Sequence, residues 1–499
     1  MDDIETIRRR RAIKVIITDI IMAVSVVAIV AILVAAVAGW RINSDFTVEQ
    51  NGLLSVKTFP AGAKIIVDDK ELEQVSNFSK MLSGGKHNVV LQRDGYESWK
   101  KTIEITPGWL TRLEYARLFK QNRDKNIIRS FEDLDFYNVS PSRSAAIFGE
   151  NGSTKWTIVK NFNSAPTFEQ VDIKGIFTNT SDGTFPYEIN SIEWSKLDTK
   201  LLVSASRIDT KGKLMTEWCI LDLADIKNSV NISINYPRYE ANSKVSLANI
   251  KDRTLKNLIF KDPNGEEVLG LVSSNLVVFD INDKAISELV LKNVAKFTYH
   301  DLAFSYLTLP TKNTPAEIRF LYEENTKPTV VAELPNNKAK ATFVSTRFNS
   351  MDYIIYTIDD NLYIQRMNDF PRNGAKLPLK PFLKLGLNIA ADTAEVSANN
   401  EFIIFKDGTR IAVYDTELEE VYEYDYEDKK FRFLDNFILY RTDEKTGNLL
   451  AWDFDHTNVR TLVVDKSVND YDALISPNNK FFYYFAKSET GVDLVQEKL

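Results

Sequence analysis

The chain has 499 residues, a formal net charge of −7, three histidines and a single cysteine, Cys219. This length predicts several domains or one large repeat fold, and a single cysteine excludes an intramolecular disulfide. The residues up to Arg41 carry six basic and four acidic side chains, a net of +2, so the remainder carries −9. An acidic body argues against nucleic acid as a partner, because phosphates require a basic surface.

The segment 16–40 is apolar from Ile20 onward except for Ser25. About 20 apolar residues in a helix can cross a bilayer, so we expect a transmembrane helix here. Basic residues stay on the cytoplasmic side of a span, and five of them precede this one: Arg8, Arg9, Arg10, Arg11 and Lys14. We therefore expect residues 1–15 to be a cytoplasmic basic tail and the bulk of the chain to be extracytoplasmic, with Trp40 at the outer interface of the bilayer.

A second interpretation of the same segment is a cleaved secretory signal, because Ala36-Val37-Ala38 resembles a signal peptidase site. The apolar run is longer than the core of a secretory signal, which has about 7–15 residues, and this favours a retained signal anchor. The polar residues 41–51 that follow predict a short spacer.

Residues 52–118 predict a small all-β domain. Apolar residues alternate with polar ones in short runs, such as Leu54 to Thr58 and 99–105. The runs end at turn-forming pairs, among them Asp68-Asp69 and Pro107-Gly108. This alternation is typical of half-buried strands, and no helix is expected in this region.

The segments GLLSVKTFPAGAKIIVDD and LSGGKHNVVLQRDGYESW resemble a PEGA domain, a family named for a Pro-Glu-Gly-Ala turn between its first two strands. The matching residues are Pro60, Ala61, Gly62 and Ala63, with Ala61 in place of the family's Glu, and Gly95 and Tyr96, which match its Gly-Tyr. The resemblance implies a small β-sandwich of bacterial and archaeal surface proteins without catalytic residues. Proline fixes φ in such a turn and glycine permits positive φ, so we expect these residues to be structural.

After a polar linker at 119–126, residues 127–499 show no helical periodicity and predict a β-propeller. A phrase with an apolar residue, a serine, a polar turn and an apolar run recurs near residues 137, 192, 343, 395 and 474. We interpret each copy as strand, turn, strand. Further strands follow, and counting these third strands gives eight, near residues 156, 217, 275, 317, 361, 409, 448 and 492. Four-stranded repeats of about 40–50 residues are typical of propellers, so we expect eight blades, with seven as the alternative.

The recurring phrase resembles the propeller repeats of the Tol-Pal periplasmic protein and of prolyl-oligopeptidases, which implies a fold and no single function. Little sequence follows the last third strand near residue 492. We therefore expect a strand from the N-terminal side, at 127–131 or in the FYNV segment after it, to close that blade, because an unpaired edge invites aggregation.

No catalytic, cofactor or metal site is predicted. His87, His300 and His456 show no metal-ligand spacing, and nucleophile-elbow, P-loop and Rossmann motifs are absent. The segment DFDHTN at 453–458 lacks the glycine and the closing glutamate of a calcium loop. Cys219 lies in an apolar stretch, and we expect it to be buried.

The expected function is a non-enzymatic, membrane-anchored binding or scaffold protein of the cell envelope, whose propeller recognises a protein or a cell-wall glycan. One alternative is an enzyme acting on envelope polysaccharide, which requires two carboxyl groups about 5–9.5 Å apart in the propeller funnel. The other alternative is a purely structural surface spacer. The spacing of residues along the sequence does not decide among the three.

Overall fold

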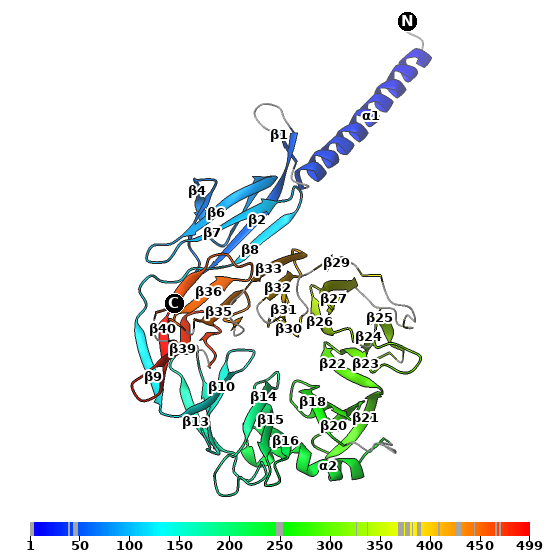
Figure 1. The fold of residues 1–499 in the computed structure, drawn as a ribbon. Helices are drawn as coiled ribbons and strands as arrows, with labels where there is room; N and C mark the ends of the chain where they lie inside the picture. The colour runs from blue at the N-terminus through cyan, green and yellow to red at the C-terminus, as the bar shows by residue number, and fades with distance from the viewer. Residues whose placement is uncertain are drawn as a thin grey trace. The chain divides into compact units, whose positions relative to one another are not determined.

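The computed structural model describes residues 4–37, 40–42, 48–245, 253–325, 327–336, 338–367, 374, 380–381, 383–386, 391–407, 410–425, 431–443, 445–464, 467–468 and 471–499. The chain divides into two compact units, Met1–Arg123 and Asp124–Leu499. It is mainly β, with one long N-terminal helix and many four-stranded sheets (Figure 1).

Helix α1 (Ile4–Val37) begins before the expected segment 16–40 and ends before its last residues. Within it, Ile13–Ala35 is a stretch of 23 residues with a mean hydropathy of 2.8, and none of it is buried in protein. Trp40 is not helical. It lies in β1 (Trp40–Ile42), which pairs with the start of β2 (Val48–Phe59). The expected spacer 41–51 is therefore partly strand, because polar residues still offer backbone groups to a neighbouring strand; its residues 43–47 lie outside the described residues.

The rest of the first unit is built from two four-stranded sheets. The first contains β1, β2, β5 (Phe78–Ser83) and β8 (Leu110–Arg117), and the second contains β3 (Lys64–Val67), β4 (Lys70–Val75), β6 (Gly85–Gln92) and β7 (Trp99–Ile105). Leu54, Ile65, Leu91 and Trp99 are at most 1% exposed and belong to its core. The all-β prediction is confirmed, although β4, β5 and β8 were not predicted. All three are edge strands, and β4 is almost entirely exposed, so hydrophobic alternation does not mark it.

The described residues of the second unit form eight four-stranded sheets around a common centre, and the first strands that Figure 1 labels lie toward this centre. The first four sheets are β10 (Leu134–Val139), β11 (Ala145–Glu150), β12 (Lys155–Lys160) and β13 (Thr167–Asp172); β14 (Glu188–Trp194), β15 (Lys200–Ile208), β16 (Leu214–Asp222) and β17 (Val230–Asn231); β18 (Leu255–Phe260), β19 (Glu267–Val272), β20 (Asn275–Asp280) and β21 (Ala285–Leu291); and β22 (Val294–His300), β23 (Ala303–Thr308), β24 (Glu317–Tyr322) and β25 (Thr329–Glu333).

The other four sheets are β26 (Ala341–Phe348), β27 (Met351–Ile358), β28 (Asn361–Met367) and β29 (Leu383–Gly386); β30 (Thr393–Val396), β31 (Phe402–Asp407), β32 (Arg410–Asp415) and β33 (Glu420–Asp425); β34 (Arg432–Phe433), β35 (Ile438–Thr442), β36 (Leu449–Asp453) and β37 (Arg460–Val463); and β38 (Leu474–Ile475), β39 (Phe481–Lys487), β40 (Val492–Lys498) and β9 (Lys125–Phe131). The expected third strands are confirmed as β12, β16, β20, β24, β28, β32, β36 and β40.

The last sheet joins the two ends of the second unit. Strand β9 pairs with β40, with Phe131 opposite Val492 and Lys125 opposite Glu497. Closure by a strand from the N-terminal side is therefore confirmed. Phe131 packs edge-on against Phe148 of the first sheet, with ring centroids 4.6 Å apart, so the closing strand contributes to the core.

The polar linker expected at 119–126 is shorter in the structure. Phe119 is fully buried, Lys120 pairs with Tyr96, and the N–H of Gln121 donates to the carbonyl of Gly95 at 3.0 Å. Strand β9 begins at Lys125, two residues before the expected start of the propeller. Backbone hydrogen bonds hold this segment at both ends, and its polar composition does not reveal them.

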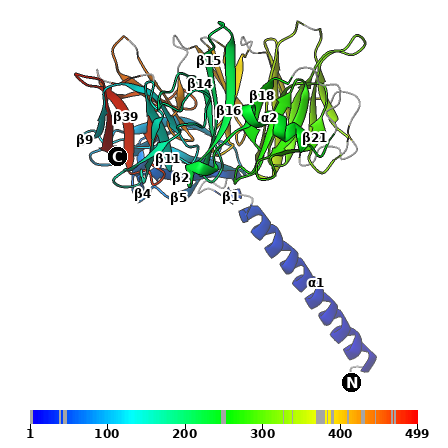
Figure 2. The ribbon, with the colours of Figure 1, turned by 90° about the horizontal axis from the view of Figure 1, so that it is seen from below.

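Helix α2 (Ile232–Ala241) contradicts the prediction that residues 127–499 contain no helix. Asn231 caps its N-terminus through a side-chain hydrogen bond, and a 3-10 turn, η1 (Ile226–Asn228), precedes it. Ile232, Tyr236 and Tyr239 are buried at helical spacing, but Pro237 obscures the pattern because proline normally ends a helix. The helix lies beside β16 and β21 (Figures 1 and 2).

The recurring sequence phrase forms the hairpin between the first two strands of a sheet. In four copies its serine is at most 2% exposed: Ser140, Ser195, Ser397 and Ser476. Each serine Oγ accepts the backbone N–H of the residue five positions later, at 2.9–3.2 Å. The serine therefore satisfies a backbone donor at the exit of a tight turn. In the copy near residue 343 the pattern is different, because Ser345 lies inside β26.

Candidate functional site

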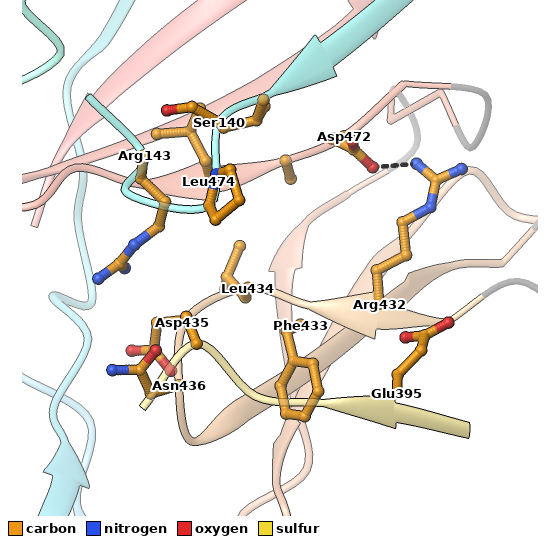
Figure 3. Close-up of a pocket in the computed structure, with 14 residues that line it drawn as sticks. Ser140, Arg143, Glu395, Arg432, Phe433, Leu434, Asp435, Asn436, Asp472 and Leu474 are labelled. Carbon is orange, nitrogen blue, oxygen red and sulfur yellow. Dashed lines mark hydrogen bonds and ion pairs between the residues drawn. The ribbon is translucent and has the colours of Figure 1, made fainter. Parts of the chain in front are cut away.

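A cavity of about 260 Å³ opens among the central strands of the propeller (Figure 3). Its lining comes from the first strands of four sheets, β10, β30, β34 and β38, and from the residues next to them. The lining residues are Val139, Ser140, Pro141, Arg143, Glu395, Ala398, Arg432, Phe433, Leu434, Asp435, Asn436, Asp472, Ala473 and Leu474. Two copies of the recurring turn therefore border the cavity, at Ser140 and next to Ala398.

At one end of the cavity Arg432 forms an ion pair with Asp472 (Figure 3). Burial raises the pKa of the Asp472 carboxyl above its ordinary value, although the neighbouring Arg432 acts in the opposite direction. The N–H of Ala473 donates to the hydroxyl of Tyr440 at 2.8 Å, which fixes the backbone beside this pair. The side chains of Arg432 and Asp472 are 39% and 29% exposed, so both reach the cavity while they remain paired.

Glu395 adds a second carboxylate to the lining. Its charge contributes to the raised pKa of Asp472, so the two groups are near enough to interact. Glu395 is paired in turn with Lys406, at 2.7 Å between Oε1 and Nζ. Two carboxyl groups are what glycoside hydrolysis requires, but here each one has a cationic partner. The pairing favours a charged binding surface over a free acid and base.

Turn residues form the opposite end of the cavity. The guanidinium of Arg143 donates to the carbonyl of Ile475 in the last sheet at 3.1 Å. The carboxylate of Asp435 accepts two backbone N–H groups of its own turn, both at 2.8 Å. Asn436 follows and also lines the cavity. This end therefore has fixed geometry, and it adds an amide that can both donate and accept.

The lining combines guanidinium donors, carboxylate and amide acceptors, and an apolar wall of Phe433, Leu434 and Leu474. Pockets for drug-sized molecules span about 300–1,000 Å³, so this cavity is smaller than that class. Its size and chemistry suit one polar protein side chain or one sugar ring. No nucleophile activated by a neighbouring base is present among the lining residues.

The residues predicted for the PEGA motif come together in the first unit. Ser76 holds the turn Pro60–Ala63, because its Oγ accepts the N–H groups of the third and fourth turn residues, both at 2.9 Å. The guanidinium of Arg93 donates to the carbonyl of Ala61 and lies over the ring of Tyr96, 5.2 Å from its centroid. Arg93 therefore links the turn to the Gly95-Tyr96 segment. Sequence reasoning missed both residues: Ser76 lies outside the two segments that carry the resemblance, and Arg93 lies in the second segment but is not one of its matching residues.

The residues predicted to set membrane topology lie in α1 and β1 of the first unit. Arg8, Arg9, Arg10 and Arg11 are in the first part of α1, and their side chains lie outside the described ones. Lys14 is exposed on the same helix, and Trp40 is 45% exposed in β1. In contrast, the residues that line the cavity were not predicted from the sequence. The recurring sequence phrase could have indicated some of them, because two copies of its turn border the cavity.

The single cysteine and the described histidines do not form a site. Cys219 is fully buried, as expected, and burial raises the pKa of its thiol. Within the part of the chain that the structure describes, no three His, Cys, Asp or Glu side chains are grouped to hold a metal ion. In the segment 453–458, the carboxylate of Asp455 accepts hydrogen bonds from Thr457, which is an ordinary turn interaction.

Comparison with known proteins gives one family match. Residues 51–118 match the model of the PEGA domain. No curated protein matches the chain in sequence.

Solved structures that resemble the chain include the C-terminal WD40 domain of Sif2, with 8% identity, a TM-score of 0.42, and coverage of 74% of this chain and 97% of that chain. Apo AztD from Citrobacter koseri has 10% identity and a TM-score of 0.38, covering 83% and 98% of the two chains. Hsv2 from Kluyvelomyces marxianus has 10% identity and a TM-score of 0.39, covering 67% and 98%. At these values the three structures carry no argument about function.

The resemblance of the propeller repeats to those of Tol-Pal and prolyl-oligopeptidase proteins stays a prediction, whereas the resemblance of residues 52–118 to a PEGA domain is confirmed. The eight described sheets around a common centre have the arrangement expected from the repeats. Residues 51–118 are therefore a PEGA domain, and a β-propeller follows it in the chain.

Proposed function

We propose that this is a single-pass membrane protein with a cytoplasmic N-terminus, and that its PEGA domain and propeller lie on the extracytoplasmic side. In this proposal the propeller has eight blades. It is a non-enzymatic scaffold of the cell envelope and binds a protein or a cell-wall glycan. The observation that carries the proposal is that none of the apolar stretch Ile13–Ala35 is buried in protein.

The large apolar side chains of this stretch are 50–68% exposed. Leaving apolar surface in water costs about 25 cal/mol per Å², and a bilayer core about 30 Å thick matches a helix of this length. The basic cluster Arg8–Arg11 precedes the stretch, which supports retention of the N-terminus in the cytoplasm. A membrane therefore accounts for both the length and the exposure of the helix.

The cavity supports binding as the activity of the propeller. Four of its charged side chains come from four separate sheets, Arg143, Glu395, Arg432 and Asp472, and they lie on a rigid scaffold of central strands. Residues at strand ends and turns of a rigid scaffold are well placed for recognition. The cationic partners of Glu395 and Asp472 support recognition of a polar group over acid–base chemistry.

Anchoring and orientation are tested together in cells that express the chain with a tag at each end. We expect the protein to remain in membranes washed with alkaline carbonate and to retain its N-terminal tag. External protease on protoplasts should degrade everything beyond about Arg41. Release by carbonate would contradict the anchor, loss of the N-terminal tag would indicate a cleaved signal, and full protection of the propeller would contradict the orientation. Replacement of Arg8–Arg11 by glutamate is the matched variant and should increase the protected fraction.

Binding is tested by hydrogen exchange of the purified full chain with envelope polysaccharide or envelope protein fractions. We expect slower exchange at residues 432–436 and 472–474, and loss of this protection in Arg432→Met. Lys155→Met, which changes an exposed lysine of β12, is the matched control and should bind normally. Turnover of a polysaccharide that Asp472→Asn abolishes would contradict the binding function and support the enzyme.

A further inference from the structure

Three residues with exposed apolar side chains lie at one end of the first sheet of the PEGA domain. Trp109 is 71% exposed, Leu110 is 45% exposed and Leu53 is 37% exposed. Leu53 of β2 and Leu110 of β8 are register partners, so their side chains lie on the same face of the sheet. The N–H of Leu53 donates to the carbonyl of Trp109 at 2.9 Å. We call Leu53, Trp109 and Leu110 the apolar edge.

Backbone hydrogen bonds fix the turn that carries Trp109. The N–H of Gly108 donates to the carbonyl of Asn51 at 3.0 Å, and the N–H of Trp109 donates to the carbonyl of Thr106 at 3.1 Å. Gly108 has φ of +78°, a conformation that favours glycine. The position of the Trp109 backbone is therefore set by β2, although its side chain remains exposed.

The apolar edge is tied to the apolar helix by a short path through the chain. Helix α1 ends at Val37, and Trp40 follows three residues later and pairs with Gln50 of β2. Gln50 lies three residues before Leu53, which is about 10 Å along a strand. When α1 spans a bilayer, this path holds the apolar edge within reach of the membrane surface at which the helix ends.

We infer that the apolar edge inserts into the lipid headgroup layer and docks the PEGA domain on the membrane surface. This inference rests on the proposed anchoring by α1. Tryptophan prefers the interface between a bilayer and water, and Trp40 and Trp109 are both exposed. Arg112 is exposed two residues after Leu110, on the same face of β8, where a guanidinium suits lipid phosphates. Lipid therefore covers both the helix and the edge beside it.

The test uses tryptophan fluorescence of the full chain in phosphatidylcholine and phosphatidylglycerol vesicles, with and without brominated acyl chains. Trp40→Phe removes the other strongly exposed tryptophan, because Trp218 is half-buried and the remaining four, Trp99, Trp156, Trp194 and Trp452, are at most 6% exposed. The emission of Trp109 is then the difference between Trp40→Phe and the double variant Trp40→Phe/Trp109→Phe. We expect brominated lipid to quench more than half of this difference.

The matched control is Phe59→Trp in the double variant, which places an exposed tryptophan at the other end of β2. This position lies six residues from Leu53, about 20 Å along the strand, and we expect no quenching there. An unquenched Trp109 in protein that resists carbonate would overturn the docking and leave the anchor intact. Release from the vesicles would overturn the anchor, and the docking with it. A Trp109 that is shielded only in native membranes, without quenching by brominated lipid, would identify a protein partner and reject the lipid.

Discussion

The turn of the PEGA domain and the central turns of the propeller use the same device, a buried serine that accepts backbone N–H groups. Ser76 holds the turn Pro60–Ala63, and Ser140 holds the first propeller turn. The surroundings differ. Arg93 near the PEGA turn bonds back to Ala61 of the same domain, whereas the propeller turns border a cavity with partly exposed charges. The PEGA turn, whose residues are close in sequence, therefore stabilises its own domain. The candidate site forms in the propeller, where turns that are distant in sequence meet.

The largest expected effect concerns the way the propeller joins its two ends. Phe131 of β9 is 3% exposed and packs against Phe148 and Phe485. Phe131→Ala should reduce the free energy of unfolding by about 3–5 kcal/mol, because it removes a large core side chain and leaves a cavity. Ile127→Ala on the same strand, where the side chain is 60% exposed, should change it by about 0.5 kcal/mol or less. Equal effects in denaturant unfolding would contradict the role of β9 in the core.

The next effect is a pH dependence of the stability of the propeller, which arises from Glu193. Glu193 of the propeller accepts the N–H of Phe260 from the neighbouring sheet at 3.0 Å, and burial raises the pKa of its carboxyl to about 7. The folded state therefore holds a proton that the unfolded state releases, so the stability falls as pH rises from about 4.5 to about 7.

Glu193→Gln keeps an acceptor and removes this titration. We expect a gain of about 1–3 kcal/mol in the free energy of unfolding at pH 8 and a smaller gain at pH 5.5. Glu150→Gln, at an exposed position of β11, is the control. A gain that does not depend on pH would show that Glu193 does not titrate in this range.

The two serine turns offer a direct test of the shared device. Ser76→Ala and Ser195→Ala each remove the side-chain acceptor of two backbone N–H groups, and each should cost about 1–3 kcal/mol. Hydrogen exchange of the full chain should become faster at residues 62–63 in the first variant and at 199–200 in the second. Ser79→Ala, at an exposed position of β5, should leave both regions unchanged. Unaltered hydrogen exchange at either turn would contradict the claim that its serine stabilises that turn.

The smallest effect concerns His87 in the PEGA domain. Its Nδ1 lies 2.7 Å from a carboxylate oxygen of Asp68, and its Nε2 lies 2.9 Å from the carbonyl of Ser83. Both neighbours only accept, so both contacts are hydrogen bonds only when both ring nitrogens carry protons, and this geometry favours the charged imidazole. Burial lowers the pKa of His87, but these two hydrogen bonds outweigh it and the pKa is raised.

This stabilisation is present below the ordinary histidine pKa of about 6.5 and is lost as pH rises through the raised value. His87→Gln should therefore cost about 1 kcal/mol or less at pH 6, since Asp68 is partly exposed, and less at pH 9. Thermal unfolding at the two pH values checks this, with Lys86→Gln as the control on the same strand. A larger cost at pH 9 would contradict a charged His87.

Local patterns explain which parts of the fold could be predicted. Alternation within single strands placed β12, β16 and β40, and a lone last strand pointed to closure by β9, because these features depend on neighbours in sequence. Helix α2 was missed because Pro237 masks its period, and β4 because an exposed edge strand needs no alternation.

The candidate site could not be predicted in the same way. Arg143, Glu395, Arg432 and Asp472 come from four sheets, and no spacing along the chain relates them. The apolar edge was not predicted from the sequence for another reason. Leu53, Trp109 and Leu110 fit a strand pattern in which each could equally be buried, and only the packed domain shows which side chains remain exposed.

Binding through the propeller cavity is tested most directly by a photo-activated cross-linking amino acid placed at Asn436 of the full chain in its own cells. Glu169 on the outer strand β13, which is exposed, carries the same group as the matched control. We expect one discrete cross-linked species from position 436 that is absent from position 169 and that Arg432→Met reduces at least tenfold. Identical products from both positions, or a product from position 436 that Arg432→Met leaves unchanged, would contradict recognition through the cavity.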